Sequence, residues 1–182
     1  MNKTVYQYTP CKDHDYALLQ WLERMRHDGE LDKVIAQNSQ APSAFLQMFS
    51  QPRQLYFKLD EMGNIALAVW IEPCMGSAFL GYYAQPAYRK NREVVHFMFD
   101  MLDSIFNYGL PMVCGFVQER PTPKETAAFI KLHEKMGYTY RGFIPKFFDG
   151  TDCHIVALTA EDWKSMETPI KRRWIKHRLE GK

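Results

Sequence analysis

The sequence lacks the patterns that mark several large classes of protein. Its cysteines form no CxxC pair, and no group of cysteines and histidines has the spacing of a zinc site. No stretch approaches the roughly 18 apolar residues that a membrane-spanning helix needs. The opening residues, MNKTVYQYTP, contain no apolar segment typical of a secretory signal. We therefore expect a cytoplasmic protein with reduced cysteines, no bound metal and no membrane segment.

Sequence motifs of common enzymes are also missing. No GxSxG, Walker or HExxH motif occurs, and there is no internal repeat or low-complexity tract. The formal net charge of +2 points to no particular partner. A chain of 182 residues with 46% hydrophobic side chains suits one globular domain that buries its own core.

Hydrophobic periodicity in the first part of the chain predicts one short strand and two helices. We expect the strand at residues 3–8. A helix capped by Asp13 or Asp15 should end near His27, and Ser43 should cap a short second helix.

From residue 55 the apolar pattern changes to that of strands. Three are predicted, joined by turns near residues 61–64 and 73–76, and they cover residues 55–59, 65–71 and 77–84. Because they follow one another closely, they should form an antiparallel meander.

The next stretch predicts a strand, a long helix and a second strand. One face of the helix carries Val94, Val95, Met98, Met101, Leu102, Ile105 and Phe106, and Gly109 suits a left-handed cap. A buried strand should follow at residues 112–117. This order suggests a right-handed βαβ unit with one parallel pair of strands.

A capping box at Thr122–Glu125 predicts another helix, which should run to Met136 and end at Gly137. Its inward side chains are expected to be Phe129, Leu132 and Met136. Two strands and a last helix complete the predicted elements, with the strands at residues 138–143 and 153–158 and the helix capped by Thr159.

Two stretches of this sequence resemble the GCN5-related N-acetyltransferase (GNAT) family. FLGYYAQPAYRKNREVVHFMFDML at residues 79–102 is similar to the family's fourth strand, pyrophosphate loop and following helix. AAFIKLHEKMGYTYRGFI at residues 127–144 is similar to its late helix, which ends in a motif of the LYEKLGF kind. The resemblance implies an α/β fold (α+β mixed sheet) over residues 1–160, mostly antiparallel with one parallel βαβ crossover and flanking helices. Residues 161–182 would be a basic helix or tail appended to it.

The resemblance also implies a binding site for acetyl-CoA as acyl donor. In the family's loop, Gln/Arg-x-x-Gly-x-Gly/Ala, glycines let backbone N–H groups approach the pyrophosphate at a helix N-terminus. Arg89 matches this loop, whereas Arg92 and Val94 replace the glycine and the small residue. The residues implied to bind the cofactor are Tyr83, Ala84, Arg89, Lys90, Asn91, Arg92, Glu93 and Val94. The alternative is a solvated helix start that binds no ligand.

The implied catalytic residues are His133, Glu119 and Tyr83. His133 stands where the family's tyrosine protonates the departing CoA thiolate, and histidine can exchange protons at neutral pH. Glu119 follows a strand and is the candidate general base. Tyr83 and Tyr82 should face opposite sides of their strand, so one of them lines the acceptor groove. The alternatives are a partly exposed helix histidine without a role, and a Glu119 that only pairs with Arg120.

The last residues form a basic segment. Residues 169–182 hold six Lys/Arg and one Glu. Phosphate contacts to nucleic acid would come from Lys171, Arg172, Arg173, Lys176 and Arg178. The alternatives are a short membrane-surface helix, and a terminal helix that docks Ile170 and Trp174 on the rest of the protein.

The sequence therefore predicts an N-acyltransferase that moves acetyl from acetyl-CoA to a primary amine by direct attack in a ternary complex. One alternative is a protein of the same fold that no longer uses CoA and serves as a binding or assembly module. The other is a nucleic-acid-modifying enzyme. The sequence identifies neither the acceptor nor the oligomeric state.

Overall fold

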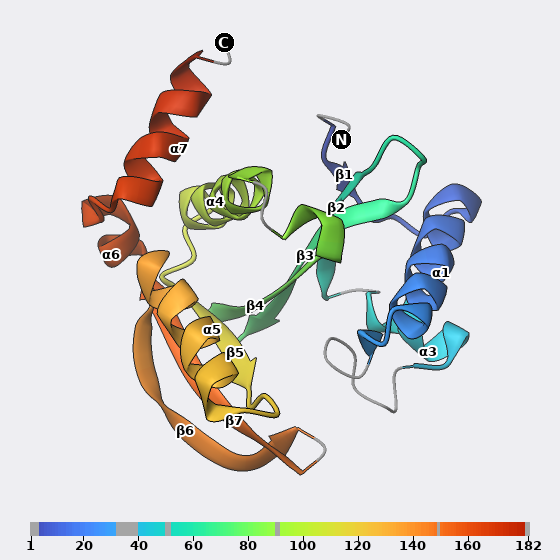
Figure 1. Cartoon of the computed structure of the whole chain (residues 1–182). Coiled ribbons are helices and arrows are strands. Elements are labelled where there is room, and N and C mark those ends of the chain that lie inside the picture. Colours follow the sequence, from blue (N-terminus) through green and yellow to red (C-terminus); the bar gives the residue numbers. More distant parts are fainter. Residues whose placement is uncertain (1–3, 32–39, 50–51, 90–91, 149, 181–182) are drawn as a thin grey trace. The chain divides into compact units, whose positions relative to one another are not determined.

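A computed structural model describes residues 4–31, 40–49, 52–89, 92–148 and 150–180 (Figure 1). The chain divides into two compact units. The first comprises Met1–Glu72 and Gly81–Val94, and the second comprises Pro73–Leu80 and Val95–Lys182. The hydrogen-bonded strand order is β1-β2-β3-β4-β5-β7-β6, and β3 and β4 contribute residues to both units. The predicted mixed α/β class, mostly antiparallel with one parallel pair, is confirmed.

The first unit begins with β1 (Tyr6–Gln7), α1 (Lys12–His27) and α3 (Pro42–Met48), and continues through β2 (Gln54–Leu59) into β3 (Ile65–Cys74). β1 pairs with β2, and β2 with β3, both antiparallel. The predicted caps of the two helices are wrong. Cys11 precedes α1 and Ala41 precedes α3, and neither donates or accepts a side-chain cap hydrogen bond.

Aromatic side chains form the core of the first unit. α1 buries Leu18, Trp21, Leu22 and Met25. Trp21 lies edge-on to Phe45 of α3, with 5.5 Å between the ring centroids, and Figure 1 shows these two helices side by side. The core therefore depends on apolar contact between the helices and strands of this unit.

The turn after β3 comes later than the sequence suggests. β3 runs through Pro73 to Cys74, and the chain reverses at Met75 and Gly76, both with positive φ, before β4 (Ser77–Ala84). A short 3₁₀ turn, η2 (Pro86–Tyr88), follows. Gly81 is required for packing, because a Cβ there would lie 2.0 Å from Cε2 of Trp70.

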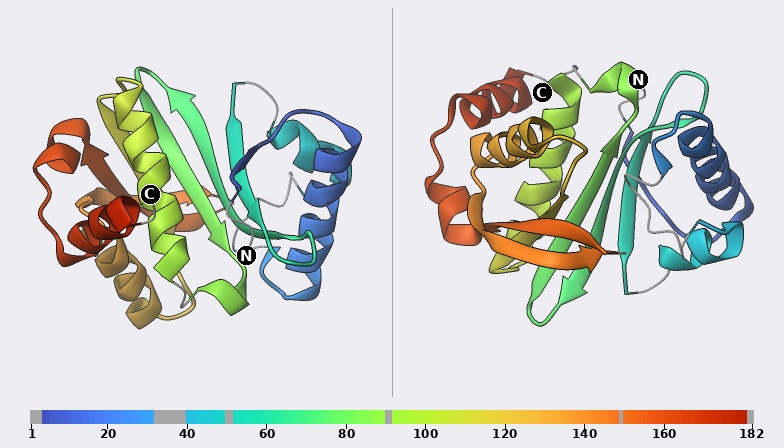
Figure 2. Two further views of the ribbon diagram at one scale, coloured as in Figure 1. Left: turned by 90° about the horizontal axis from the view of Figure 1, so that it is seen from above. Right: turned by 60° about the horizontal axis from the view of Figure 1, so that its bottom comes forward.

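The second unit contains most of α4 (Arg92–Asn107), then β5 (Met112–Gln118), α5 (Pro123–Lys135), β6 (Thr139–Phe148) and β7 (Thr151–Thr159). β4 pairs with β5 in parallel, which confirms the predicted βαβ unit. β7 pairs antiparallel with both β5 and β6. The views in Figures 1 and 2 show α5 lying along the β6–β7 hairpin.

The buried face of α5 differs from the prediction. Thr122 caps the helix as expected, with its hydroxyl accepting from the N–H of Glu125. However, Phe129 and Leu132 are 36% and 39% exposed, and the buried side chains of the helix are Thr126 and His133. Phe129 is held at the surface by the Arg120 guanidinium, which lies 4.5 Å from its ring centroid. Met136, the third side chain predicted to face inward, is 1% exposed, so the prediction is right for Met136 and wrong for Phe129 and Leu132.

Two helices, rather than one, follow β7. Thr159 caps α6 (Ala160–Ser165) as predicted, accepting from the N–H of Asp162 at 3.0 Å, but this helix does not carry the basic segment. A second helix, α7 (Pro169–Glu180), does. The break precedes Pro169, whose ring disfavours helical backbone in the residue before it.

α7 packs against α4 within the second unit, as the views of Figure 2 show. Trp174 is 4% exposed, and its indole N–H donates to the Asp100 carboxylate at 2.9 Å. Arg178 donates to Asp103 at 2.6 Å. The alternative of a docked terminal helix is therefore correct for Trp174. In the described part of the chain, no helix combines the length and hydropathy needed to cross a membrane.

Candidate active site

His133 is a buried histidine with a defined hydrogen bond. It lies in the last turn of α5 and is 4% exposed, so the expectation of a partly exposed surface histidine is wrong. Its Nδ1 lies 2.9 Å from the Phe129 carbonyl oxygen. A carbonyl only accepts, so Nδ1 carries the proton and Nε2 is the nitrogen with the lone pair. Burial lowers the pKa of His133, and the bond to Phe129 opposes this only in part. The imidazole is therefore neutral near pH 7.

Gly115 on β5 lets this imidazole approach the sheet. A Cβ at Gly115 would stand 3.7 Å from Nε2 of His133 and 3.1 Å from a methyl group of Val156. Any larger side chain would fill the space in front of Nε2. Our sequence reasoning missed Gly115, although an isolated glycine inside a strand is a signal for close approach of another group.

The part of β5 next to Gly115 differs from the start of the strand in its pairing with β4. β4 and β5 form only two register pairs, Ala78 with Val113 and Phe79 with Cys114. Beyond Cys114, β5 continues to Gln118 and remains paired with β7 on its other side. Within the described residues, Gly115–Gln118 has no register partner from β4.

Glu119 follows this edge and is exposed. Its backbone N–H donates to the Asp152 carbonyl at 2.9 Å. Arg120, the expected partner of its carboxylate, stacks on Phe129 instead. The Thr126 hydroxyl accepts from the Arg120 N–H at 2.9 Å and so anchors the start of α5.

Tyr83 belongs to the first unit and is 4% exposed. It packs on Trp21, with 5.3 Å between ring centroids, so it is the core member of the tyrosine pair and Tyr82 lies on the other face of β4. Burial raises the pKa of Tyr83; Arg89 opposes this, and Asp28 and Glu30 reinforce it. Tyr83 is therefore a neutral phenol at neutral pH.

The residues of the predicted pyrophosphate loop are only partly described. The guanidinium of Arg89 donates to the Glu30 carboxylate, and its Nε donates to the Ala84 carbonyl oxygen at 3.1 Å. Lys90 and Asn91 lie outside the described residues. Arg92 begins α4, Arg92 and Glu93 are exposed, and Val94 is half-buried.

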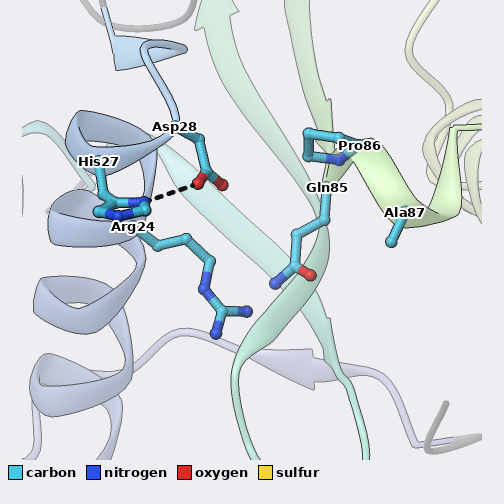
Figure 3. Close-up of a pocket in the computed structure, with 6 residues that line it drawn as sticks. All are labelled: Arg24, His27, Asp28, Gln85, Pro86 and Ala87. Carbon is cyan, nitrogen blue, oxygen red and sulfur yellow. Dashed lines mark hydrogen bonds and ion pairs between the residues drawn. The ribbon is translucent and has the colours of Figure 1, made fainter.

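A cavity of about 650 Å³ lies in the first unit, between the last turn of α1 and the end of β4. α1 and the residue after it contribute Arg24, His27 and Asp28, and the segment after β4 contributes Gln85, Pro86 and Ala87 (Figure 3). No group of three potential metal ligands occurs among the described residues, and the expectation that no metal is used stays a prediction.

The five cations predicted to contact nucleic acid are mostly engaged within the protein. Lys171 is 7% exposed and donates to the Trp163 carbonyl, and Arg178 is bound to Asp103. Arg172 pairs with Glu167 at 3.1 Å and Lys176 with Glu180 at 3.6 Å. Nucleic-acid binding stays a prediction, but Lys171 and Arg178 are poorly placed for it.

Together, these elements define an N-acetyltransferase type of fold. No family model and no curated protein sequence matches the chain. Solved structures do match it over most of its length. A mutant spermidine N-acetyltransferase from Vibrio cholerae has a TM-score of 0.67 at 11% identity, covering 89% of this chain and 98% of its own.

Two ribosomal-protein acetyltransferases are similar as well. The ribosomal-protein-S5-alanine acetyltransferase from Vibrio fischeri has a TM-score of 0.63 at 16% identity and covers 90% of this chain and 97% of its own. The ribosomal-protein-S18-alanine N-acetyltransferase from Escherichia coli has a TM-score of 0.61 at 16% identity, and the match covers 91% of this chain and 97% of its own. At these identities the likeness establishes the GNAT fold of the chain, which confirms the resemblance at the level of fold.

Proposed function

We propose that the protein is an N-acyltransferase that transfers acetyl from acetyl-CoA to a primary amine. The observation that supports this most directly is the β5 edge at Gly115–Gln118, which follows a two-pair ladder with β4 and lies beside Nε2 of a buried histidine. The amide groups of a pantetheine arm would pair with the backbone of this edge, as an added strand does. The thioester would then arrive near Gly115.

In this proposal the amine attacks the thioester carbonyl carbon and displaces the CoA thiolate. Because Nε2 of neutral His133 holds a lone pair, it first accepts the proton that the attacking nitrogen loses. The resulting imidazolium gives the same proton to the thiolate, so the products are the N-acetyl amine and free CoA. His133 thus acts as a relay. Exposed Glu119 takes the first proton from an acceptor that arrives as ammonium.

The resemblance to the GNAT family assigns further residues to the donor. Backbone atoms of Tyr83 and Ala84 would bind the thioester carbonyl. The segment from Arg89 to Val94 would bind the pyrophosphate. Arg89 is fixed by Glu30 and by the Ala84 carbonyl, so it also holds the end of β4 in position. The start of α4 at Arg92 offers backbone N–H groups and the positive end of its dipole to an anion.

Thermal unfolding with acetyl-CoA, CoA and dephospho-CoA tests the proposal. A ligand at about 100 times its Kd stabilises by about 2.7 kcal/mol, which raises Tm by roughly 5–10 °C for a chain of this size. We expect this shift with acetyl-CoA, and a smaller one in Arg89→Ala. Arg53→Ala is the matched control, since Arg53 is also paired with one carboxylate, Glu72, in the same unit.

Transfer itself is measured as acetyl-CoA consumption by chromatography, because exposed Cys11 would react with thiol reagents. His133→Asn keeps a donor for the Phe129 carbonyl but removes Nε2, and should abolish turnover while acetyl-CoA still binds. The absence of a Tm shift with every CoA species would refute the transferase and favour a binding or assembly module.

A further inference from the structure

The backbone at the end of α5 turns back toward His133. Two N–H groups that follow the helix bond to carbonyls of its last turn: Gly137 donates to Glu134 at 2.9 Å, and Tyr138 donates to His133 at 3.0 Å. Gly137 has a φ of 94°. These two bonds and the left-handed glycine are the features of a Schellman motif, which ends many helices.

A Schellman motif often joins the side chains of its first and last residues in a hydrophobic contact. In this motif those residues are His133 and Tyr138. Their rings meet edge-on, with 5.4 Å between the centroids and 84° between the planes, and each residue is 4% exposed. The turn that ends the helix therefore packs a buried aromatic ring against the imidazole that we assign to the proton relay.

The imidazole needs such a contact to keep one orientation. The Phe129 carbonyl, one helical turn earlier, holds Nδ1 at 2.9 Å. The opposite edge of the ring faces Gly115, where an added Cβ would lie 3.7 Å from Nε2 and 3.8 Å from Cδ2. Rotation about the Cβ–Cγ bond has a broad, roughly two-fold preference in histidine. A half-turn would exchange Nδ1 with Cδ2 and would carry Nε2 away from β5.

We propose that Tyr138 is a positioning residue of the acetyl transfer, whose ring holds the His133 imidazole with Nε2 toward β5 at Gly115. The inference rests on the proposed function, because Tyr138 acts only through His133 and exchanges no proton itself. Since the rings meet edge-on, phenylalanine should preserve the contact and leucine should lose it. A displacement of about 1 Å at a reacting group can lower a rate about 100-fold.

Nitrogen NMR of the full chain without CoA measures the tautomer and the pKa of His133, whose signals are those missing in His133→Asn. In wild type and in Tyr138→Phe we expect the proton on Nδ1 and a pKa below the ordinary histidine value. In Tyr138→Leu the smaller side chain leaves room for water. The pKa should therefore rise toward the ordinary value, and a measurable fraction of the neutral imidazole should carry its proton on Nε2.

Kinetics distinguish positioning from donor binding. Tyr138→Leu should lower kcat for acetyl transfer at least about tenfold and leave the KM for acetyl-CoA within about threefold of wild type, whereas Tyr138→Phe should keep both within about threefold. Because the relay needs a neutral imidazole, the acidic limb of the kcat profile of Tyr138→Leu should move to higher pH together with the pKa of His133.

Phe106→Leu is the matched control. Phe106 is similarly buried, at 6% exposed, and its ring stacks on Trp163 in the same unit. This variant also replaces a buried ring with leucine, so it should lose stability in urea as Tyr138→Leu does. It should nevertheless leave the tautomer of His133, its pKa and kcat unchanged.

Three results would overturn the inference. Tyr138→Leu could keep the wild-type tautomer, pKa and kcat; Tyr138→Phe could lose as much as Tyr138→Leu, which would assign the effect to the hydroxyl; or Phe106→Leu could change His133 as strongly, which would make loosened packing the cause. If Tyr138→Leu is unfolded by circular dichroism, Tyr138→Met takes its place in each comparison. If wild type transfers no acetyl, the proposed function fails, and the NMR result still decides whether Tyr138 positions His133.

Discussion

Replacing His133 with methionine separates what the buried imidazole contributes to stability from what it contributes to chemistry. The side chain is 4% exposed and forms a hydrogen bond with the Phe129 carbonyl, which also has the usual backbone partner of a helix. Losing that bond costs about 0.5–1.5 kcal/mol, while relieving the burial of a polar group returns about 1–3 kcal/mol. At pH 8 we therefore expect the free energy of unfolding of His133→Met to lie within about 1 kcal/mol of wild type.

The difference should grow in acid. The pKa of His133 is lower in the folded protein than in the unfolded chain, so below about pH 6.5 the unfolded chain binds the extra proton and stability falls as pH falls. At pH 5, 1.5 units below the ordinary histidine pKa, this loss cannot exceed about 2 kcal/mol at 1.36 kcal/mol per unit. His133→Met does not lose this stability, so it should become the more stable protein at pH 5.

Urea unfolding of both proteins at pH 8 and pH 5 measures these free energies. His27→Gln is the control, because it replaces a histidine whose side chain is 89% exposed. A loss of more than about 2 kcal/mol at pH 8 would mean that the fold requires the histidine. An unaltered pH dependence in His133→Met would refute the neutral, buried imidazole.

Three further substitutions test the packing of the chain. Trp174→Ala should lower the free energy of unfolding by about 3–5 kcal/mol in urea, as the loss of a large buried side chain does. Ile175→Ala, on the exposed side of α7, should change it by no more than about 0.5 kcal/mol. Equal effects of the two substitutions would contradict the docked helix. Gly81→Ala should lower the free energy of unfolding by about 1–3 kcal/mol, because the added methyl group meets Trp70. Adding Trp70→Leu to the same chain should restore part of this stability, which Tm measures. Gly115→Val should remain folded by circular dichroism, yet its rate of acetyl transfer should fall at least tenfold, because the added methyl groups reach the His133 imidazole. Full activity of this variant would show that His133 takes no part in the reaction.

Most elements could be predicted because their signals are local. The Thr122–Glu125 capping box and the left-handed cap at Gly137 (φ 94°) each depend on neighbouring residues, and the structure contains both. The predicted caps of α1 and α3 are wrong because the residues before these helices, Cys11 and Ala41, form no side-chain cap hydrogen bond. The acidic and serine residues inside the first turns have the side chains that usually cap a helix, so the sequence pattern favours them.

The inward face of α5 could not be read from periodicity. Phe129 and Leu132 are apolar and correctly spaced, but Arg120 stabilises Phe129 at the surface, and Thr126 and His133 take the buried positions. A pattern of apolar residues does not reveal a polar side chain whose partner is a distant backbone group. Arg120 N–H, the partner of Thr126, comes from the connection that precedes the helix.

The functional proposal depends on a buried polar group that reduces stability. His133 gives up its charge to be buried. A fold selected only for stability would have an apolar side chain at this position, so its polarity suggests that a reaction needs it. His133→Met should therefore stay close to wild-type stability at pH 8 and transfer no acetyl. If it is inactive and also clearly less stable, the histidine serves the fold, and the chemistry must be sought elsewhere in the protein.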